Sequence, residues 1–358
     1  MVRQGRDYLV GLRDGRHVQL GGEVVSDITT HPAFCNAVQS IVRLYDTVHA
    51  HPERYQYSET DGGPLYSAIW LRPKTTEDLR KRREVHQAIA DLTYGLMGRS
   101  PDHVSGFITG MACEPSVADR HGQGFGRNLV SYWEYVRDND LYVSYAVAPP
   151  GRARTPEAMR PGERPPATDP LKSAALRVVS EDDKGVTVWG TKILATAAIL
   201  SDELFIGNLL PMSPGEEAFA ITFAVPTGAP GVKLLPRKSY ELDSPVALDG
   251  PLAHRFDETD AVVFFENVFV PWERVFNHGH IDTALALFHD TPAHVLGNAQ
   301  AHTRLLSKMR LALGLIHRIS ELTGTANIPA VKDELAARAM EVAVVQSLIA
   351  AEDAAPHR

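Results

Sequence analysis

Three stretches of the chain differ in the spacing of their apolar residues, and in the first stretch this spacing is helical. Thr75 or Thr76 can cap a helix, because a threonine hydroxyl accepts a hydrogen bond from the free N–H groups of a first turn. The apolar stripe of this helix consists of Val85, Ile89, Leu92 and Leu96. We therefore expect residues 1–140 to form an N-terminal helical domain of helices and connecting loops.

The period changes between residues 141 and 150, and residues 151–170 are rich in Pro and Arg, as a loop at a domain boundary would be. Short apolar runs then follow, each bounded by Gly, Pro or Asp, which is the pattern of β-strands. These runs are GVTVWG at residues 185–190, AFAITFAV at 218–225 and AVVFFENVFV at 261–270. The pattern predicts a central antiparallel β domain over residues 141–275.

Helical spacing returns after Pro271 and predicts two amphipathic helices joined by a short loop. The first ends near Gly324, and its stripe consists of Leu305, Met309, Ala312, Ile316 and Ile319. The stripe of the second consists of Leu335, Ala339, Val342, Val345 and Ile349. A bundle usually needs about four helices to enclose a core, so one hairpin leaves apolar surface exposed. We expect residues 276–358 to be the start of a truncated C-terminal helical domain, completed by missing sequence or by another chain.

The composition and charge limit the classes of protein to which the chain can belong. Of the 358 residues, 44% are hydrophobic and 22% are charged, which is ordinary globular usage. A formal charge of -8 argues against nucleic acid or an anionic membrane surface as partner and favours a small molecule. Cys35 and Cys113 lack metal-ligand or disulfide-framework spacing, which fits a reducing compartment. We see no secretory signal and no run of 18 apolar residues, so we expect a cytoplasmic protein.

Two short motifs are interpreted as turns. Gly122, Gly124 and Gly126 imitate a phosphate-binding loop, but they follow no predicted strand and lack the spacing of a dinucleotide fingerprint. His278 and His280 have a metal-binding spacing, but no third ligand is fixed near them by sequence. We therefore predict no nicotinamide site and no metal site.

Four segments together resemble a known family. They are DITTHPAFCNAVQSIVRLYD (27–46), YGLMGRSPDH (94–103), VWGTKILATAAILSDELFIGN (188–208) and RFDETDAVVFFENVFVPWERV (255–275). Over residues 5–347 they resemble, in order and spacing, the oxygenase components of two-component flavin monooxygenases, the 4-hydroxyphenylacetate 3-hydroxylase family. The resemblance implies an α+β fold of the acyl-CoA dehydrogenase type, with a helical domain, a β domain and a C-terminal helical bundle, assembled as a homodimer or homotetramer.

The resemblance also implies the chemistry. Reduced FAD would lie in a groove between the domains, delivered by a separate NAD(P)H:flavin reductase. Molecular oxygen would add to it as a C4a-hydroperoxide, which transfers one oxygen to the ring carbon ortho or para to a phenolic hydroxyl. The protein would have to exclude water so that peroxide is not lost.

A phenol reacts best as phenolate, so the site needs a cation and a proton acceptor beside its oxygen. Arg99 matches the substrate arginine of the family. His103 and Tyr145 stand where the 4-hydroxyphenylacetate branch has tyrosine and histidine, and His103 is the expected base because its unperturbed pKa is near 6.5. His289 falls where the family has a loop that closes over the ring, and is expected to bind substrate. For each residue a purely structural role is the alternative.

The flavin-side residues are also implied by the resemblance. Thr196 matches a position beside the isoalloxazine ring, and Arg154 matches the arginine of a Pro-x-x-x-Arg loop, with Arg152 as competitor. The remaining residues expected at the cofactor are Tyr145, Gly151, Leu194, Ala195 and Ala197.

Three other readings stay open. A 4-hydroxybutyryl-CoA dehydratase would need cluster cysteines that the sequence lacks, and the GRSPDH segment argues against an acyl-CoA dehydrogenase. An inactive or fragmentary subunit is the third. Phenol, a halophenol, a nitrophenol, 4-hydroxyphenylacetate and a carrier-bound tyrosine could each use Arg99 and His103.

Overall fold

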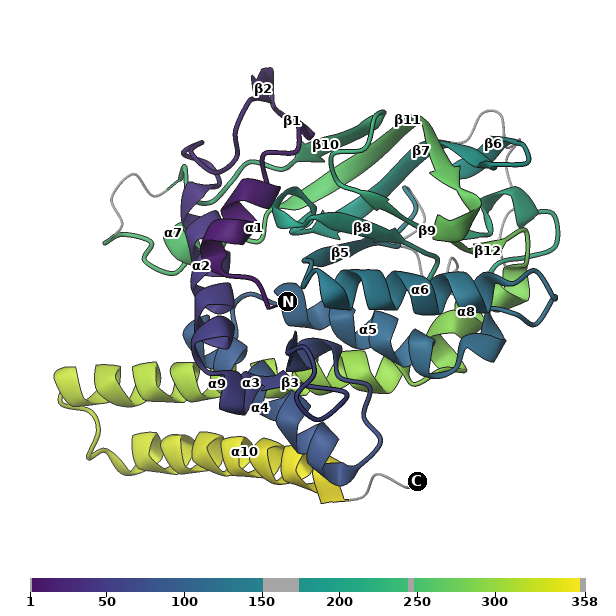
Figure 1. Cartoon of the computed structure of the whole chain (residues 1–358). Helices are drawn as coiled ribbons and strands as arrows, with labels where there is room; N and C mark the ends of the chain where they lie inside the picture. The colour runs from purple at the N-terminus through teal and green to yellow at the C-terminus, as the bar shows by residue number, and fades with distance from the viewer. Residues whose placement is uncertain (1, 151–173, 244–247, 355–358) are drawn as a thin grey trace.

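A computed structural model describes residues 2–150, 174–243 and 248–354 of the chain. The order of its elements is helical, then mainly β, then helical. Figure 1 shows two sheets above a layer of helices, with a long helical hairpin below that layer. This order agrees with the helical domain, β domain and C-terminal helices that the resemblance implied. In the described residues, no helix is long and apolar enough to cross a membrane.

The larger sheet has six strands in the order β2-β1-β10-β11-β7-β6. Its longest strands, β7 (Gly185–Thr196) and β11 (Asp260–Pro271), coincide with two predicted runs and pair antiparallel. The other strands are β1 (His17–Leu20), β2 (Glu23–Val25), β6 (Arg177–Glu181) and β10 (Val232–Pro236). Val186, Val188, Val263 and Phe265 are buried between the sheets and helices because alternate residues of a strand face one side.

The smaller sheet has the order β12-β9-β8-β5 and packs on the larger one, where the rings of Phe223 and Phe265 meet edge to face at 5.8 Å. Its strands are β5 (Val143–Ala146), β8 (Glu203–Ile206), β9 (Ile221–Pro226) and β12 (Val275–His278). The expectation of antiparallel pairing holds except for two pairs, β1 with β10 and β5 with β8, which are parallel. These strands come from distant parts of the chain and need no hairpin.

The expectation that residues 1–140 contain only helices and loops was wrong in two places. Strands β1 and β2 extend the larger sheet, because β1 pairs with β10 more than 200 residues later. A short pair, β3 (Gln56–Tyr57) with β4 (Tyr66–Ser67), lies among the helices. Both pairs are too short for alternation to be recognised in the sequence. The predicted domain boundaries stay a prediction.

Helices form the layer below the sheets. They are α1 (Gly5–Gly11), α2 (Cys35–Ala50), α3 (Pro52–Tyr55), α4 (Thr76–Leu92), α5 (Pro101–Cys113), α6 (Phe125–Asp138) and α7 (Ala253–Phe256). The Thr75 hydroxyl accepts the backbone N–H of Asp78 at 3.1 Å, so the predicted cap of α4 is confirmed. Helix α4 ends before Leu96, because Tyr94 and Gly95 adopt positive φ values that an α-helix cannot contain.

The C-terminal helices are α8 (Ile281–His289), α9 (Ala293–Leu322) and α10 (Pro329–Ala354), and the last two form the predicted hairpin. Gly324, at φ +71°, follows the end of α9 as expected. Apolar side chains of the hairpin remain exposed, among them Leu322, Met340 and Leu348. The predicted exposed apolar surface is therefore present on the described hairpin, although Ile349 is buried.

Helix α5 packs very closely against α9 (Figure 1). A Cβ atom on Gly110 would lie 2.2 Å from the Ala293 nitrogen, and one on Gly106 would lie 2.8 Å from the Leu296 carbonyl oxygen. Glycine at both positions lets the two backbones approach. Because of this contact, α9 runs past the first turn of α5, and His103 lies in that turn.

We expect Gly110→Ala to destabilise the fold by about 1–3 kcal/mol, because the added methyl overpacks the α5–α9 contact. The matched control is Gly314→Ala, a helix-interior glycine of α9 whose added Cβ would meet no atom within 4 Å. That change should stabilise by about 0.5–1 kcal/mol, because alanine loses less backbone freedom on folding than glycine. Urea denaturation checks both, and equal effects at the two positions would contradict the packing argument.

Candidate active site

The turn that presents Arg99 is held from two sides. The Glu258 carboxylate accepts the backbone N–H of Gly98 at 2.6 Å and also that of Arg99. The Tyr142 hydroxyl donates to the Arg99 carbonyl oxygen at 2.5 Å. The partly exposed guanidinium of Arg99 lies 5.6 Å from the centre of the Tyr145 ring, within range of a cation–π interaction.

His103 lies one turn further on, in the first turn of α5, and is 5% exposed. Its ring centre is 5.6 Å from that of Tyr145. The structure thus brings together Arg99, His103 and Tyr145, which the sequence analysis had grouped from positions 46 residues apart. Their catalytic and substrate-binding roles stay predictions.

The neighbours of His103 determine which of its two ring nitrogens is protonated. Its Nδ1 lies 3.2 Å from Oε1 of Gln300 on α9. The Gln300 amide is oriented by Asp102, whose carboxylate accepts from Nε2 of Gln300 at 3.4 Å. Because an ionised carboxylate only accepts, the oxygen of Gln300 faces His103, and His103 Nδ1 must donate to it. Nε2 then carries the lone pair, and in the described structure this buried atom has no hydrogen-bond partner.

Asp102 is completely buried and is fixed by two further donors. His86 Nδ1 donates to its Oδ2 at 2.9 Å, and the Ser100 hydroxyl donates to its Oδ1 at 2.6 Å. Burial opposes ionisation, but the hydrogen bond and charge of His86, together with Ser100, lower the pKa of Asp102 below its usual value. The ionised form therefore orients Gln300.

Burial, followed by the positive charge of Arg99, lowers the pKa of His103 to about 3. The unperturbed value near 6.5, which made His103 the expected base, does not hold in the fold because water is excluded from the imidazole. At neutral pH His103 is uncharged. It offers Nε2 as a hydrogen-bond acceptor and is a weaker base than the sequence suggested.

Aromatic side chains line the same space. Phe107, one turn after His103, packs edge to face on Tyr145 at 6.0 Å and on Phe288 of α8 at 5.8 Å. His289, the next residue, is exposed and its ring lies 5.7 Å from that of His294. The structure therefore does not bring His289 to the cluster, and it ends a helix instead of lying in the expected loop. Its substrate-binding role stays a prediction.

The end of β7 carries the predicted cofactor residues. Leu194 and Ala197 adopt positive φ values of +57° and +60°, so the strand bends sharply. Half of the Leu194 surface is exposed, while Ala195 and Ala197 are buried. The Ser144 hydroxyl donates to the Thr196 carbonyl oxygen at 2.8 Å, and the Thr196 hydroxyl donates to the Asp260 carboxylate. Three other predicted cofactor residues lie outside the described residues: Gly151, Arg152 and Arg154.

Glu258 joins the two halves of this region. Its side chain holds the Gly98–Arg99 turn, and its backbone carbonyl oxygen accepts the N–H of Ala197 at 2.9 Å. The sequence analysis missed Glu258, although it lies within one of the four family segments. It also missed Gln300 and Phe288. A buried glutamine within an apolar helix and a phenylalanine beside a histidine are weak signals, because only the tertiary contacts distinguish them.

Comparisons with known proteins agree with this arrangement. The model of the family described as "4-hydroxyphenylacetate 3-hydroxylase N terminal" matches residues 4–277, and the one described as "4-hydroxyphenylacetate 3-hydroxylase C terminal" matches residues 284–358. The oxygenase component of 4-hydroxyphenylacetate 3-monooxygenase from Geobacillus sp. (strain PA-9) is 32% identical over 93% of this chain and 66% of its own length. The oxygenase component of 4-nitrophenol 2-monooxygenase from Rhodococcus sp. is 32% identical over 92% of this chain and 62% of its own length.

Solved structures give the same result. The crystal structure of the oxygenase component of 4-hydroxyphenylacetate 3-monooxygenase in complex with FAD has a TM-score of 0.88 and 30% identity. The alignment covers 98% of this chain and 71% of that one. A 4-hydroxybutyryl-CoA dehydratase from N. maritimus has a TM-score of 0.80 at 19% identity, which indicates a shared fold alone. On the two matches that together cover nearly all of its residues, the chain belongs to the 4-hydroxyphenylacetate 3-hydroxylase family.

Proposed function

We propose that this chain forms the substrate side of the oxygenase component of a two-component, FAD-dependent phenol monooxygenase. The observation that carries the proposal is the buried, unpartnered Nε2 of His103, whose ring and the Arg99 guanidinium both lie against the Tyr145 ring. An acceptor and a permanent cation grouped in this way match the hydroxyl and the developing negative charge of a phenol. Relatives named as 4-hydroxyphenylacetate and 4-nitrophenol monooxygenases support this substrate class.

Each side chain of the cluster has a distinct role in binding. His103 Nε2 accepts the phenolic proton in a hydrogen bond, while the Arg99 guanidinium stabilises negative charge on the oxygen. The aromatic rings of Phe107 and Tyr145 contact the faces and edges of the substrate ring. Phe288 closes the apolar wall on the side of α8 and helps to exclude water.

The low pKa of His103 is compatible with proton transfer. A phenol that donates ring electrons to an electrophilic oxygen becomes a much stronger acid as the new C–O bond forms. A weak base is then sufficient to take the proton late in the reaction. Until that stage, the neutral imidazole only orients the hydroxyl, and Arg99 supplies the charge.

The bent end of β7 fits a planar, largely apolar cofactor ring. Leu194 offers exposed apolar surface, the alanines beside it leave room, and the Thr196 hydroxyl can still accept a hydrogen bond through its oxygen. Bound reduced FAD supplies the activated oxygen that is transferred to the substrate. The FAD complex of a family member at 30% identity supports this assignment.

We further propose that a separate flavin reductase supplies the reduced FAD, because relatives carry the words "oxygenase component" in their names. The chain spans 56–66% of the length of the curated relatives compared with it, so the activity of the whole protein is part of the proposal. A homo-oligomeric state and a cytoplasmic location stay predictions.

Arg99→Ala should lower phenol hydroxylation by at least about 100-fold, since the substrate charge loses its stabilising cation. Flavin oxidation and hydrogen peroxide release should continue. The assay measures product and peroxide with reduced FAD from a generic reductase, for a panel of phenols. Arg43→Ala, an exposed arginine of α2, is the control and should retain both rates. Equal loss of hydroxylation and flavin oxidation in Arg99→Ala would mean that Arg99 is structural.

His103 should make the fold sensitive to mild acid. Its folded pKa of about 3 lies below the usual value, so the unfolded chain binds more protons between about pH 6.5 and 3. Stability therefore falls as pH is lowered through this window, by up to about 1.4 kcal/mol per pH unit from this group. His103→Gln should lose less stability than the wild type between pH 7 and 5 in urea denaturation. Equal losses would contradict the buried neutral imidazole.

Gln300→Leu should leave His103 as a mixture of its two neutral tautomers, because Nδ1 loses the acceptor that keeps it protonated. The 15N spectrum of histidine-labelled protein should show the Nδ1–H form of His103 in the wild type and a mixture in the variant. Coupling of flavin oxidation to hydroxylation should fall at least about tenfold. Asn298→Leu on the same helix is the matched control. An unchanged His103 tautomer in Gln300→Leu would refute the positioning role.

A further inference from the structure

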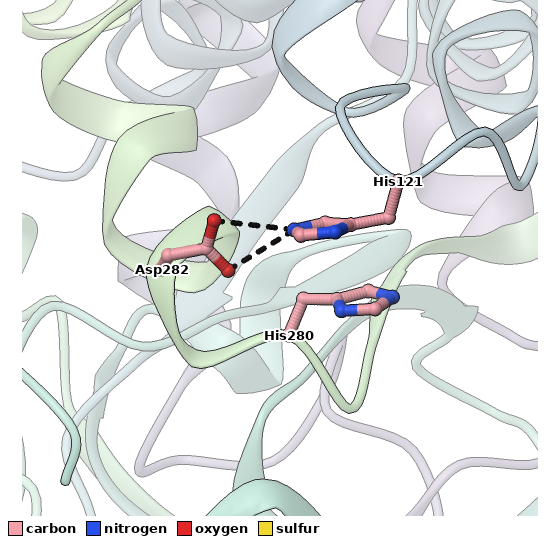
Figure 2. Close-up of side chains that lie close together, drawn as sticks. All are labelled: His121, His280 and Asp282. Atoms are coloured by element: carbon pink, nitrogen blue, oxygen red, sulfur yellow. Dashed lines mark hydrogen bonds and ion pairs between the residues drawn. The ribbon is translucent and has the colours of Figure 1, made fainter. Parts of the chain in front are cut away.

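Three metal-ligating side chains meet on a surface away from the cluster of Arg99 and His103. His121 lies in the loop before α6, His280 precedes α8, and Asp282 lies in the first turn of α8 (Figure 2). One ligand atom from each lies within 4.8 Å of those of the other two. The two imidazole rings are stacked, with centres 3.7 Å apart and planes 9° from parallel.

His278 and His280, which were interpreted as part of a loop from the sequence, do not face each other. Gly279, at φ +76°, lies between His278 and His280 and lets the two side chains diverge. His278 contacts Glu181 at 3.2 Å and packs on Trp272. His280 instead stacks on His121, which lies 159 residues earlier in the chain. The third ligand that the sequence could not place is supplied by the fold.

The spacing of these atoms suits a divalent transition metal. His121 Nε2 lies 3.2 Å and 3.1 Å from the two carboxylate oxygens of Asp282. Two ligands of a tetrahedral Zn²⁺, each about 2.0–2.1 Å from the ion, are themselves about 3.3 Å apart. His121 Nε2 and the Asp282 carboxylate therefore already have the separation of two zinc ligands. In the hydrogen bond a proton lies between them, where the ion would lie. His280 needs only a side-chain rotation, which a partly exposed residue can make.

A neighbouring amide orients the second histidine. His280 Nε2 lies 3.1 Å from the side-chain oxygen of Gln123. Donation to this oxygen leaves the lone pair on Nδ1, and such a hydrogen bond is typical of histidines that bind metals.

We propose that His121, His280 and Asp282 form a binding site for Zn²⁺ or a similar divalent transition metal, with water completing the coordination. Two imidazoles and one carboxylate are ligands that such ions accept, whereas Mg²⁺ and Ca²⁺ prefer oxygen ligands alone. The ion would tie the loop before α6 to the beginning of α8. That loop is also linked to the far end of α8 by an ion pair between Arg120 and Asp290.

The test is calorimetric titration of ZnCl₂ into the purified chain after treatment with a chelator. One equivalent should bind with micromolar affinity, and His121→Ala, His280→Ala and Asp282→Asn should each weaken binding at least about tenfold. His278→Ala is the matched control and should bind as the wild type does. Circular dichroism checks that the variants fold. We expect them to fold, because the three side chains are exposed or partly exposed.

Cobalt gives a second readout that does not depend on affinity. Co²⁺ in the same site should show visible bands of a four- or five-coordinate ion, which are lost in His121→Ala and His280→Ala. Zn²⁺ should also raise the melting temperature of the wild type and of His278→Ala, but not that of the other variants. Absence of saturable one-to-one binding, retention of binding in His121→Ala, or loss of binding in His278→Ala would each overturn the proposal.

Discussion

The candidate site depends on one partly buried glutamate that links two distant pieces of backbone. Glu258 accepts the N–H groups of Gly98 and Arg99 through its side chain and the N–H of Ala197 through its carbonyl oxygen. Removal of this carboxyl group from water raises the pKa of Glu258 to about 7, and the two backbone N–H groups oppose that rise because they favour the charged form. Glu258 thus links the turn that presents Arg99 directly to the strand end that is proposed to face the flavin.

The electronic state of His103 depends on helix packing in a comparable way. Gln300 reaches His103 only because α9 runs within backbone contact of α5 at Gly106 and Gly110. Asp102 then sets the direction of the whole chain of hydrogen bonds, from carboxylate to amide to imidazole. A change in the distance between the two helices would alter which nitrogen of His103 carries the proton. Chemistry at the site is thus linked to side chains that touch no substrate.

Features with a local physical cause could be predicted from the sequence. The cap at Thr75, the end of α9 near Gly324 and the long strands β7 and β11 each follow from a few adjacent residues. The grouping of Arg99, His103 and Tyr145 came from the family resemblance. Strand β1, Glu258 and Gln300 could not be predicted, because each depends on a partner more than 150 residues away, and β2 pairs with β1. The lowered pKa of His103 could not be foreseen, because the sequence does not show that the imidazole is buried.

Helix α5 turns its glycines and its aromatic residues toward the same neighbour. Gly106 and Gly110 let α9 come into backbone contact, and the Phe107 ring packs so closely on α9 that a Cβ on Gly297 would lie 2.5 Å from it. A substitution at position 107 therefore acts on the position of α9 as well as on the aromatic cluster. Phe288 contacts Phe107 from α8 instead. The shape of the aromatic cluster can thus be varied more independently from α8 than from α5, and mutational exploration of this region is best begun at position 288.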